Sequence, residues 1–242
     1  MPPRTVRDTE NQVREVLTWL ERRGSRKNRE GMARYGIVAP KAFGVSVATL
    51  QQLGKRLGRD HTLAGALWKT GWYEARMLTA FVGEPARVTS AQMDRWARDF
   101  DNWAICDHLC FHLFDRTPLA WARVAPWSRR PEEFVKRAAF ALLAGLGLHD
   151  KAAADARFLR ALPLIERGAA DDRNFVKKGV SWALRVIGRR NRALNAAAVE
   201  LAGRLAASEP PSARWVGRGA HRELTGAVVR RALARQEAAG RG

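Results

Sequence analysis

Cysteine is scarce in this chain of 242 residues, which has only Cys106 and Cys110, four positions apart. Two such cysteines exclude the disulfide framework of a small secreted domain and fit a reducing cytoplasm. With four isoleucines, two tyrosines and no sustained alternation of apolar and polar residues, β-sheet is not expected. The longest apolar run, near Ala138–Leu148, is too short to span a bilayer. We therefore expect neither a signal peptide nor a membrane span.

Acidic residues are also few. The chain has 24 Asp and Glu against 43 Lys and Arg, a formal net charge of +19. This excess favours a polyanionic partner, most simply nucleic acid, with an anionic membrane surface or a ribosomal environment as other candidates. With 46% hydrophobic and 28% charged residues, the composition is typical of a globular protein.

Common catalytic and cofactor motifs are missing. The chain has no glycine-rich phosphate loop, no dinucleotide fingerprint, no His-Glu-x-x-His and no nucleophile elbow. Cys106 and Cys110 form an i, i+4 pair, as do His108 and His112, but the two pairs point to different helix faces and no second cluster exists. We expect no metal site and no cofactor, and we expect the cysteines to be small core residues.

What the chain has is helical periodicity. Alanine, leucine and arginine dominate, and residues 9–21 form an amphipathic helix pattern. Glycine and proline divide the rest into segments mostly ten to twenty residues long, typical of an all-α fold. The predicted breakers are Gly24-Ser25, Pro40, Gly58, Gly83-Glu84-Pro85, Thr117-Pro118, Pro126, Pro163 and Pro210-Pro211.

A repeat with an offset near 40 residues runs through these segments. Residues 134–140 align with residues 175–181, and the start of the pattern returns at residues 215–218. Residues 73–76 have the same form, in which an aromatic residue is followed three positions later by a basic residue. That period is typical of HEAT-like helical pairs, which stack into an α-solenoid with a concave face. If each aromatic lies in the core and each cation at its edge, the concave face is basic. The alternative is a set of ordinary amphipathic helices that form no repeat and whose arginines are exposed to solvent.

The repeat predicts a single HEAT-like domain over residues 1–242. In this interpretation residues 1–30 are an N-terminal helical cap and residues 235–242 are a flexible tail.

Trp103 and Asp107 are the first candidate functional pair. They lie four apart, on one helix face, after Asp101-Asn102, a plausible N-cap. An indole face and a carboxylate together suit a cationic ligand. The alternative is a buried tryptophan with a structural aspartate that acts as a cap or a salt-bridge partner.

A second candidate group surrounds Trp182. Lys178 precedes it by four residues and Arg185 follows by three, so the three side chains share a helix face. Arg137 takes the position of Lys178 in the preceding repeat, and Arg218 takes the cation position of the last. These residues form either an aromatic surface beside phosphate-binding groups or a core tryptophan with snorkelling neighbours.

Taken together, these segments resemble the AlkD family of DNA alkylation repair glycosylases, from Met32 to the last repeat. Residues 32–35 are similar to the family's N-terminal aromatic segment, and Trp103-x-x-x-Asp107 resembles its catalytic pair. Residues 136–139 resemble the segment that carries an arginine near the lesion, and Trp182-x-x-Arg185 resembles the segment with the second active-site tryptophan.

The resemblance implies a HEAT-like solenoid that holds duplex DNA containing alkylated bases. It implies a monofunctional glycosylase, a monomer in the cytoplasm and at the nucleoid, that hydrolyses the N-glycosidic bond of cationic purines such as N3-methyladenine and N7-methylguanine. The base is not captured in a pocket. The implied catalytic residues are Asp107, Trp103 and Trp182. The expected DNA contacts are Arg137, Arg185, Lys178, Tyr35 and Arg218.

Two alternatives fit the same charge and repeat. One is a non-catalytic basic HEAT-type scaffold that binds nucleic acid or an acidic partner. The other is a glycosylase for bulky or crosslinked adducts, since an enzyme without a confining pocket tolerates large leaving bases.

Overall fold

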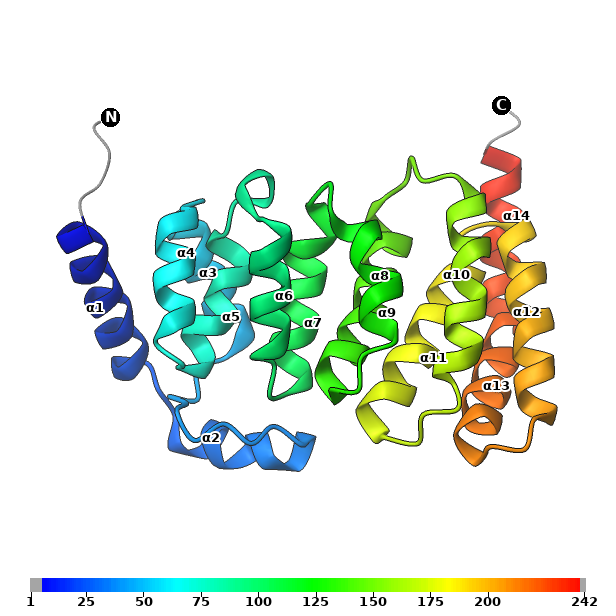
Figure 1. Cartoon of the computed structure of the whole chain (residues 1–242), viewed down its shortest axis with the longest axis horizontal. Coiled ribbons are helices and arrows are strands. Elements are labelled where there is room, and N and C mark those ends of the chain that lie inside the picture. The colour runs from blue at the N-terminus through cyan, green and yellow to red at the C-terminus, as the bar shows by residue number, and fades with distance from the viewer. Residues whose placement is uncertain (1–5, 240–242) are drawn as a thin grey trace. The chain divides into compact units, whose positions relative to one another are not determined.

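The computed structural model describes residues 6–239, and these residues form α-helices and short 3-10 turns without any strand. The all-α prediction is therefore confirmed. The chain divides into two compact units, Met1–Pro118 and Leu119–Gly242 (Figure 1). Within residues 6–239, no helix is both long enough and apolar enough to cross a membrane.

In the first unit, α5 is the central helix and packs against α3, α4 and α7, while α1 packs on α4. The elements are α1 (Val6–Arg22), α2 (Arg26–Met32), η1 (Ala33–Tyr35), α3 (Val47–Leu57), α4 (His61–Lys69), α5 (Tyr73–Val82), η2 (Pro85–Arg87), α6 (Ser90–Arg98), α7 (Trp103–His112) and η3 (Phe114–Arg116).

Local sequence explains where these helices begin. Ser46, Asp60 and Thr89 each accept a hydrogen bond from the amide three residues on, and so cap α3, α4 and α6. The amphipathic pattern predicted over residues 9–21 is α1, which buries Val16 and Leu20.

In the second unit, α9 packs against α8 and α11, and α11 packs in turn against α13. The helices are α8 (Ala120–Ser128), α9 (Glu133–His149), α10 (Asp155–Gly168), α11 (Asn174–Gly188), α12 (Arg192–Ala207), α13 (Pro211–Leu224) and α14 (Ala227–Ala239). Residues 235–239, expected in a C-terminal tail, continue α14, and residues 240–242 lie outside the described part of the chain.

The approach of α13 to α12 is close enough to require glycine. A Cβ at Gly217 would lie 2.3 Å from the amide nitrogen of Ala206 and 2.6 Å from the carbonyl oxygen of Ala202. Glycine here therefore sets the face that α13 turns toward α12.

Two predicted helix breakers are wrong. Pro126 lies inside α8 and Pro163 lies inside α10. A proline in a helix removes one backbone hydrogen bond, at a typical cost of about 3 kcal/mol. In α10 that cost is offset by burial on both sides of the proline, where Phe158 and Ile165 are fully covered.

The repeat marks equivalent helix starts. Tyr73 is the first residue of α5, while Phe134 and Phe175 are the second residues of α9 and α11, with their rings 5.5 Å apart. The predicted placement of aromatics inside and cations outside is nevertheless wrong at two positions. Arg137 is only 6% exposed, whereas Trp215 is 49% exposed. Each side chain's burial depends on the helix packed beside it, which the repeat does not specify.

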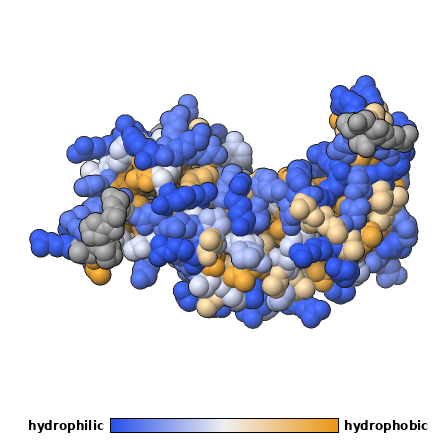
Figure 2. All heavy atoms as spheres, turned by 90° about the horizontal axis from the view of Figure 1, so that it is seen from above, coloured by the Kyte–Doolittle hydropathy of each residue, from blue (hydrophilic) through white to orange (hydrophobic). Residues whose placement is uncertain are grey.

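The face of the molecule drawn in Figure 2 is mostly hydrophilic. Hydrophilic side chains cover most of the face that Figure 2 shows, with smaller hydrophobic areas between them.

Candidate functional site

The start of α7 presents Trp103 and Asp107. Asn102, which is 1% exposed, accepts hydrogen bonds from the amides of Ala104 (3.1 Å) and Ile105 (3.0 Å) through its side-chain oxygen. The predicted N-cap is therefore confirmed, and Trp103 is the first residue of the helix. Asp107 lies one turn further along, within the helix, so it is not the cap. Both side chains are half-buried.

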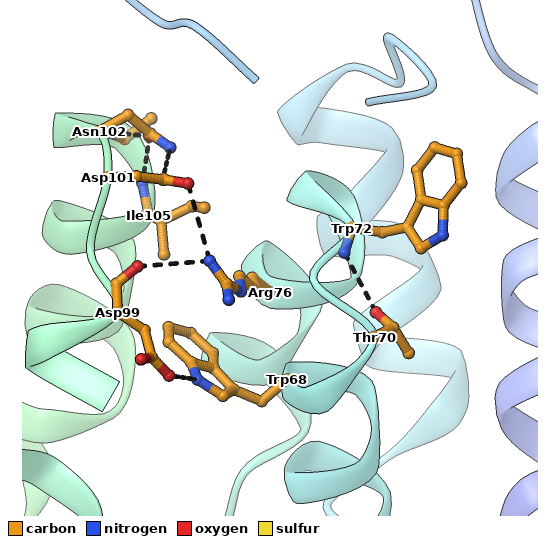
Figure 3. Close-up of polar contacts among 9 residues, drawn as sticks. Trp68, Thr70, Trp72, Arg76, Asp99, Asp101, Asn102 and Ile105 are labelled. Carbon is orange, nitrogen blue, oxygen red and sulfur yellow. Dashed lines mark hydrogen bonds and ion pairs between the residues drawn. The ribbon is translucent and has the colours of Figure 1, made fainter. Parts of the chain in front are cut away.

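The loop that leads into α7 is held by an arginine and a tryptophan (Figure 3). Arg76 Nη1 donates to the carbonyl oxygen of Asp99 (3.3 Å) and lies 3.7 Å from Asp101 Oδ2. Its guanidinium stands 5.0 Å from the centre of the Trp68 ring, and Trp68 Nε1 donates to Asp99 Oδ2 at 2.8 Å. The position of Trp103 thus depends on α4 and α5 as well as on its own cap.

Arg76 is not among the predicted site residues, although it takes the cation position of the repeat in the segment Tyr73–Arg76. Its side chain is only 18% exposed. Its partner Asp99 lies 23 residues further along the chain, so spacing along one helix does not predict this structural role.

Tyr35 contacts Trp103 through its backbone. Trp103 Nε1 donates a hydrogen bond of 2.8 Å to the carbonyl oxygen of Tyr35, whose own side chain is 71% exposed. The first unit therefore brings together three of the predicted site residues, Tyr35, Trp103 and Asp107. The Tyr35 phenol is available to a partner, while its carbonyl orients the indole.

A buried carboxylate anchors the segment that follows Tyr35. Glu74 of α5 is fully buried and accepts hydrogen bonds from three successive amides: Phe43 (3.0 Å), Gly44 (2.7 Å) and Val45 (3.2 Å). Gly44 has φ +83°, a backbone conformation that glycine adopts without strain. The Phe43 ring stacks 4.0 Å from Trp72. Sequence reasoning missed this clamp because an isolated glutamate gives no sign of its burial.

Three further side chains of α7, those of Cys106, Cys110 and His108, lie in the core or against the helix backbone. Cys106 and Cys110 are fully buried, as predicted for core residues, and burial raises the pKa of the Cys110 thiol well above its usual range. Burial lowers the pKa of His108, whose Nδ1 lies 2.9 Å from the carbonyl oxygen of Ala104. Within residues 6–239, no group of three or more His, Cys, Asp or Glu is placed to hold a metal ion.

In the second unit, Arg137 and Trp182 lie on neighbouring helices. Arg137 of α9 donates through Nη1 to the carbonyl oxygen of Phe175, 2.6 Å away at the start of α11. Trp182, two turns further along α11, is half-buried. The buried guanidinium therefore holds the two helices in register.

A salt-bridge network also fixes the start of α11. Asp171 Oδ2 lies 2.9 Å from Lys136 Nζ and 2.6 Å from Arg173 Nη2. Hydrogen bonds from Arg173, followed by those from Lys136, hold the pKa of the Asp171 carboxyl well below its usual range. Arg173 Nη1 also donates to the carbonyl oxygen of Pro131 (2.6 Å), which ties this loop to the segment before α9.

The other predicted DNA-binding cations differ in their availability. Lys178 and Arg218 are exposed. Arg185 instead pairs with Glu223 at 2.8 Å, and Arg189 pairs with the same carboxylate at 2.5 Å. Much of the charge of Arg185 is thus balanced within the protein.

Comparisons with known proteins agree with this architecture. A sequence model of the family described as "DNA alkylation repair enzyme" matches residues 16–233. No curated protein matches the chain. A solved structure described as "a new family of proteins related to the HEAT-like repeat DNA glycosylases with affinity for branched DNA structures" superposes with a TM-score of 0.71 at 20% identity. The match covers 79% of this chain and 82% of the other, and it shows a HEAT-like fold.

Proposed function

The chain belongs to the family of DNA alkylation repair enzymes, and on this premise we propose that it is a monofunctional DNA glycosylase for cationic alkylated purines in duplex DNA. Its substrates are bases of the N3-methyladenine and N7-methylguanine type. One observation carries the proposal. An indole and a carboxylate, Trp103 and Asp107, stand half-buried one turn apart on a helix whose first turn is capped by Asn102 and whose preceding loop is held by Arg76.

The chemistry suits these side chains. Alkylation at N3 or N7 gives the purine a positive charge, so it leaves readily with the electron pair of the C1′–N bond. Positive charge then develops on the deoxyribose. Asp107 stabilises that charge and orients the water that adds to C1′ and releases its proton to solvent. The ring face of Trp103 stabilises the same cation, and Trp182 is the other proposed catalytic residue.

In this mechanism the protein contacts the sugar and the backbone and does not enclose the base. Tyr35, Arg185, Lys178 and Arg218 are the proposed DNA contacts, whereas Arg137 is buried against Phe175 and supports the packing of α9 on α11. Lys178 and Arg218 are exposed and able to reach phosphates directly. Hydrolysis by water leaves no covalent bond between enzyme and DNA.

Release of free base tests the proposal. The protein is incubated with duplex DNA carrying N7-methylguanine, and the released purine is measured by chromatography. We expect purine release without a borohydride-trapped complex. Duplex binding without any release would instead identify a non-catalytic DNA-binding scaffold.

The salt dependence of duplex binding tests the role of Lys178. We expect Lys178→Ala to reduce the slope of log K against log salt concentration by about 0.9, the contribution of one phosphate contact on duplex DNA. The matched control is Arg204→Ala, because Arg204 is already paired with Glu166 and Glu200. Equal slopes for wild type and Lys178→Ala would show that this lysine is solvated surface.

A further inference from the structure

A groove of about 870 Å³ lies between α11 and α13 in the second unit. The proposed glycosylase mechanism does not use it as a cavity. Its volume falls within the range of small-ligand sites. Its lining residues include Arg185, Arg214, Trp215, Arg218, Arg222 and Glu223.

Trp215 is the exposed aromatic of this groove. Nearly half of the residue, 49%, is accessible, although tryptophan is highly buried on average. On the opposite side of α13, Val216 is fully buried and Gly217 lies against α12. The orientation of α13 is therefore set by core packing, and that orientation leaves the indole in the groove.

Cations surround this indole. Lys177 Nζ of α11 lies 5.7 Å from the ring centre, within cation–π range. Arg218 and Arg222 follow Trp215 by three and seven residues, so they share its face of α13. Both are exposed, and neither side chain has an ion-pair or hydrogen-bond partner among residues 6–239.

The other charged groups of the groove are already engaged. Glu223, its one carboxylate, is paired with Arg185 and Arg189. Arg214 donates to the carbonyl oxygens of Ser208 and Glu209. The unpaired charge of the groove is therefore positive and comes from Arg218 and Arg222.

We propose that this groove binds an unpaired nucleotide of DNA, with its base stacked on Trp215 and the flanking phosphates paired with Arg218 and Arg222. A base within a duplex is covered on both faces by its neighbours, so an indole can stack only on a base that is free of the helix. An exposed aromatic beside phosphate-binding cations is the arrangement that single-stranded nucleic acid requires. Along α13, Arg218 and Arg222 lie about 4.5 and 10.5 Å beyond Trp215, so their guanidinium groups can reach successive phosphates.

Binding to overhang DNA tests this proposal. Fluorescence anisotropy compares a blunt duplex with the same duplex extended by a five-nucleotide single-stranded overhang, both without alkylated bases. We expect wild type to prefer the overhang and Trp215→Ala to weaken overhang binding about five- to a hundredfold, the usual effect of losing one stacked base. Trp215→Phe retains a stacking ring and should restore most of the preference.

An overhang of abasic nucleotides distinguishes base stacking on Trp215 from pairing of the phosphates with the arginines. It keeps the phosphates but offers no base, so wild type and Trp215→Ala should bind it equally. Arg222→Ala should reduce the salt slope for the overhang duplex by about 0.7, the value for one single-strand phosphate, whereas Arg204→Ala should not.

Two results would overturn the proposal. One is equal binding of wild type to blunt and overhang duplexes. The other is an equal loss of affinity for both DNAs in Trp215→Ala when its thermal unfolding matches that of wild type. Because the DNA carries no alkylated base, this test is independent of purine release. Failure of the glycosylase proposal would therefore leave it intact.

Discussion

Asp107→Asn is expected to reduce the rate of N7-methylguanine release about a thousandfold while duplex binding is retained. A carboxylate about 4 Å from a developing unit charge contributes roughly 4 kcal/mol at an effective dielectric constant near 20. Each 1.36 kcal/mol corresponds to about a tenfold change in rate. The amide of asparagine has nearly the same shape, so the packing of α7 is preserved while the negative charge is lost.

Single-turnover release from methylated duplex, together with binding to unmodified duplex, measures this effect. Asp172→Asn is a matched control because it makes the same chemical change at an exposed carboxylate of the second unit. Release by Asp107→Asn within threefold of wild type would exclude Asp107 from the chemical step.

The double variant Asp107→Asn/Trp182→Ala extends this test. Residues that act on one transition state have non-additive effects on rate. If both side chains stabilise the same deoxyribose cation, the double variant should be less impaired than the product of the two single effects. Additive losses would assign Trp182 to a different step.

Glu74→Ala is expected to lower the free energy of unfolding by about 3 kcal/mol, because it leaves buried amides without an acceptor. The amides concerned are those of Phe43, Gly44 and Val45, which all donate to this carboxylate. The same segment follows Tyr35, whose carbonyl accepts from Trp103. We therefore expect Glu74→Ala to slow purine release even at temperatures where it remains folded.

Urea unfolding followed by circular dichroism measures the stability change. Glu30→Ala is the control, because Glu30 is exposed and its one ion pair within residues 6–239 is with Arg26 on the same helix, so its loss should change stability by less than about 0.5 kcal/mol. Glu74→Gln keeps an acceptor oxygen and should be intermediate between wild type and Glu74→Ala. Equal stability of Glu74→Ala and Glu30→Ala would mean that the loop is not anchored by this carboxylate.

Local features of the sequence determined the class of fold and the start of α7. Helical periodicity and the near-40-residue offset predicted helices whose equivalent aromatics lie at the starts of α5, α9 and α11. Asn102 was identifiable as a cap because its side chain bonds to amides two and three residues away. These features depend on interactions within a few residues, so pattern and spacing are sufficient to find them.

Tertiary structure decided how individual charged and aromatic side chains are used. Arg137 and Arg185 have the same sequence pattern as Lys178 and Arg218, yet Arg137 is buried against Phe175 and Arg185 is paired with Glu223. The Glu74 clamp joins groups about thirty residues apart. Only folding brings such partners together. The spacing of residues along one helix does not show which of its faces a neighbouring helix covers and which face stays exposed to solvent. The exposure of Trp215 was determined in the same way, by the packing of α13 against α12.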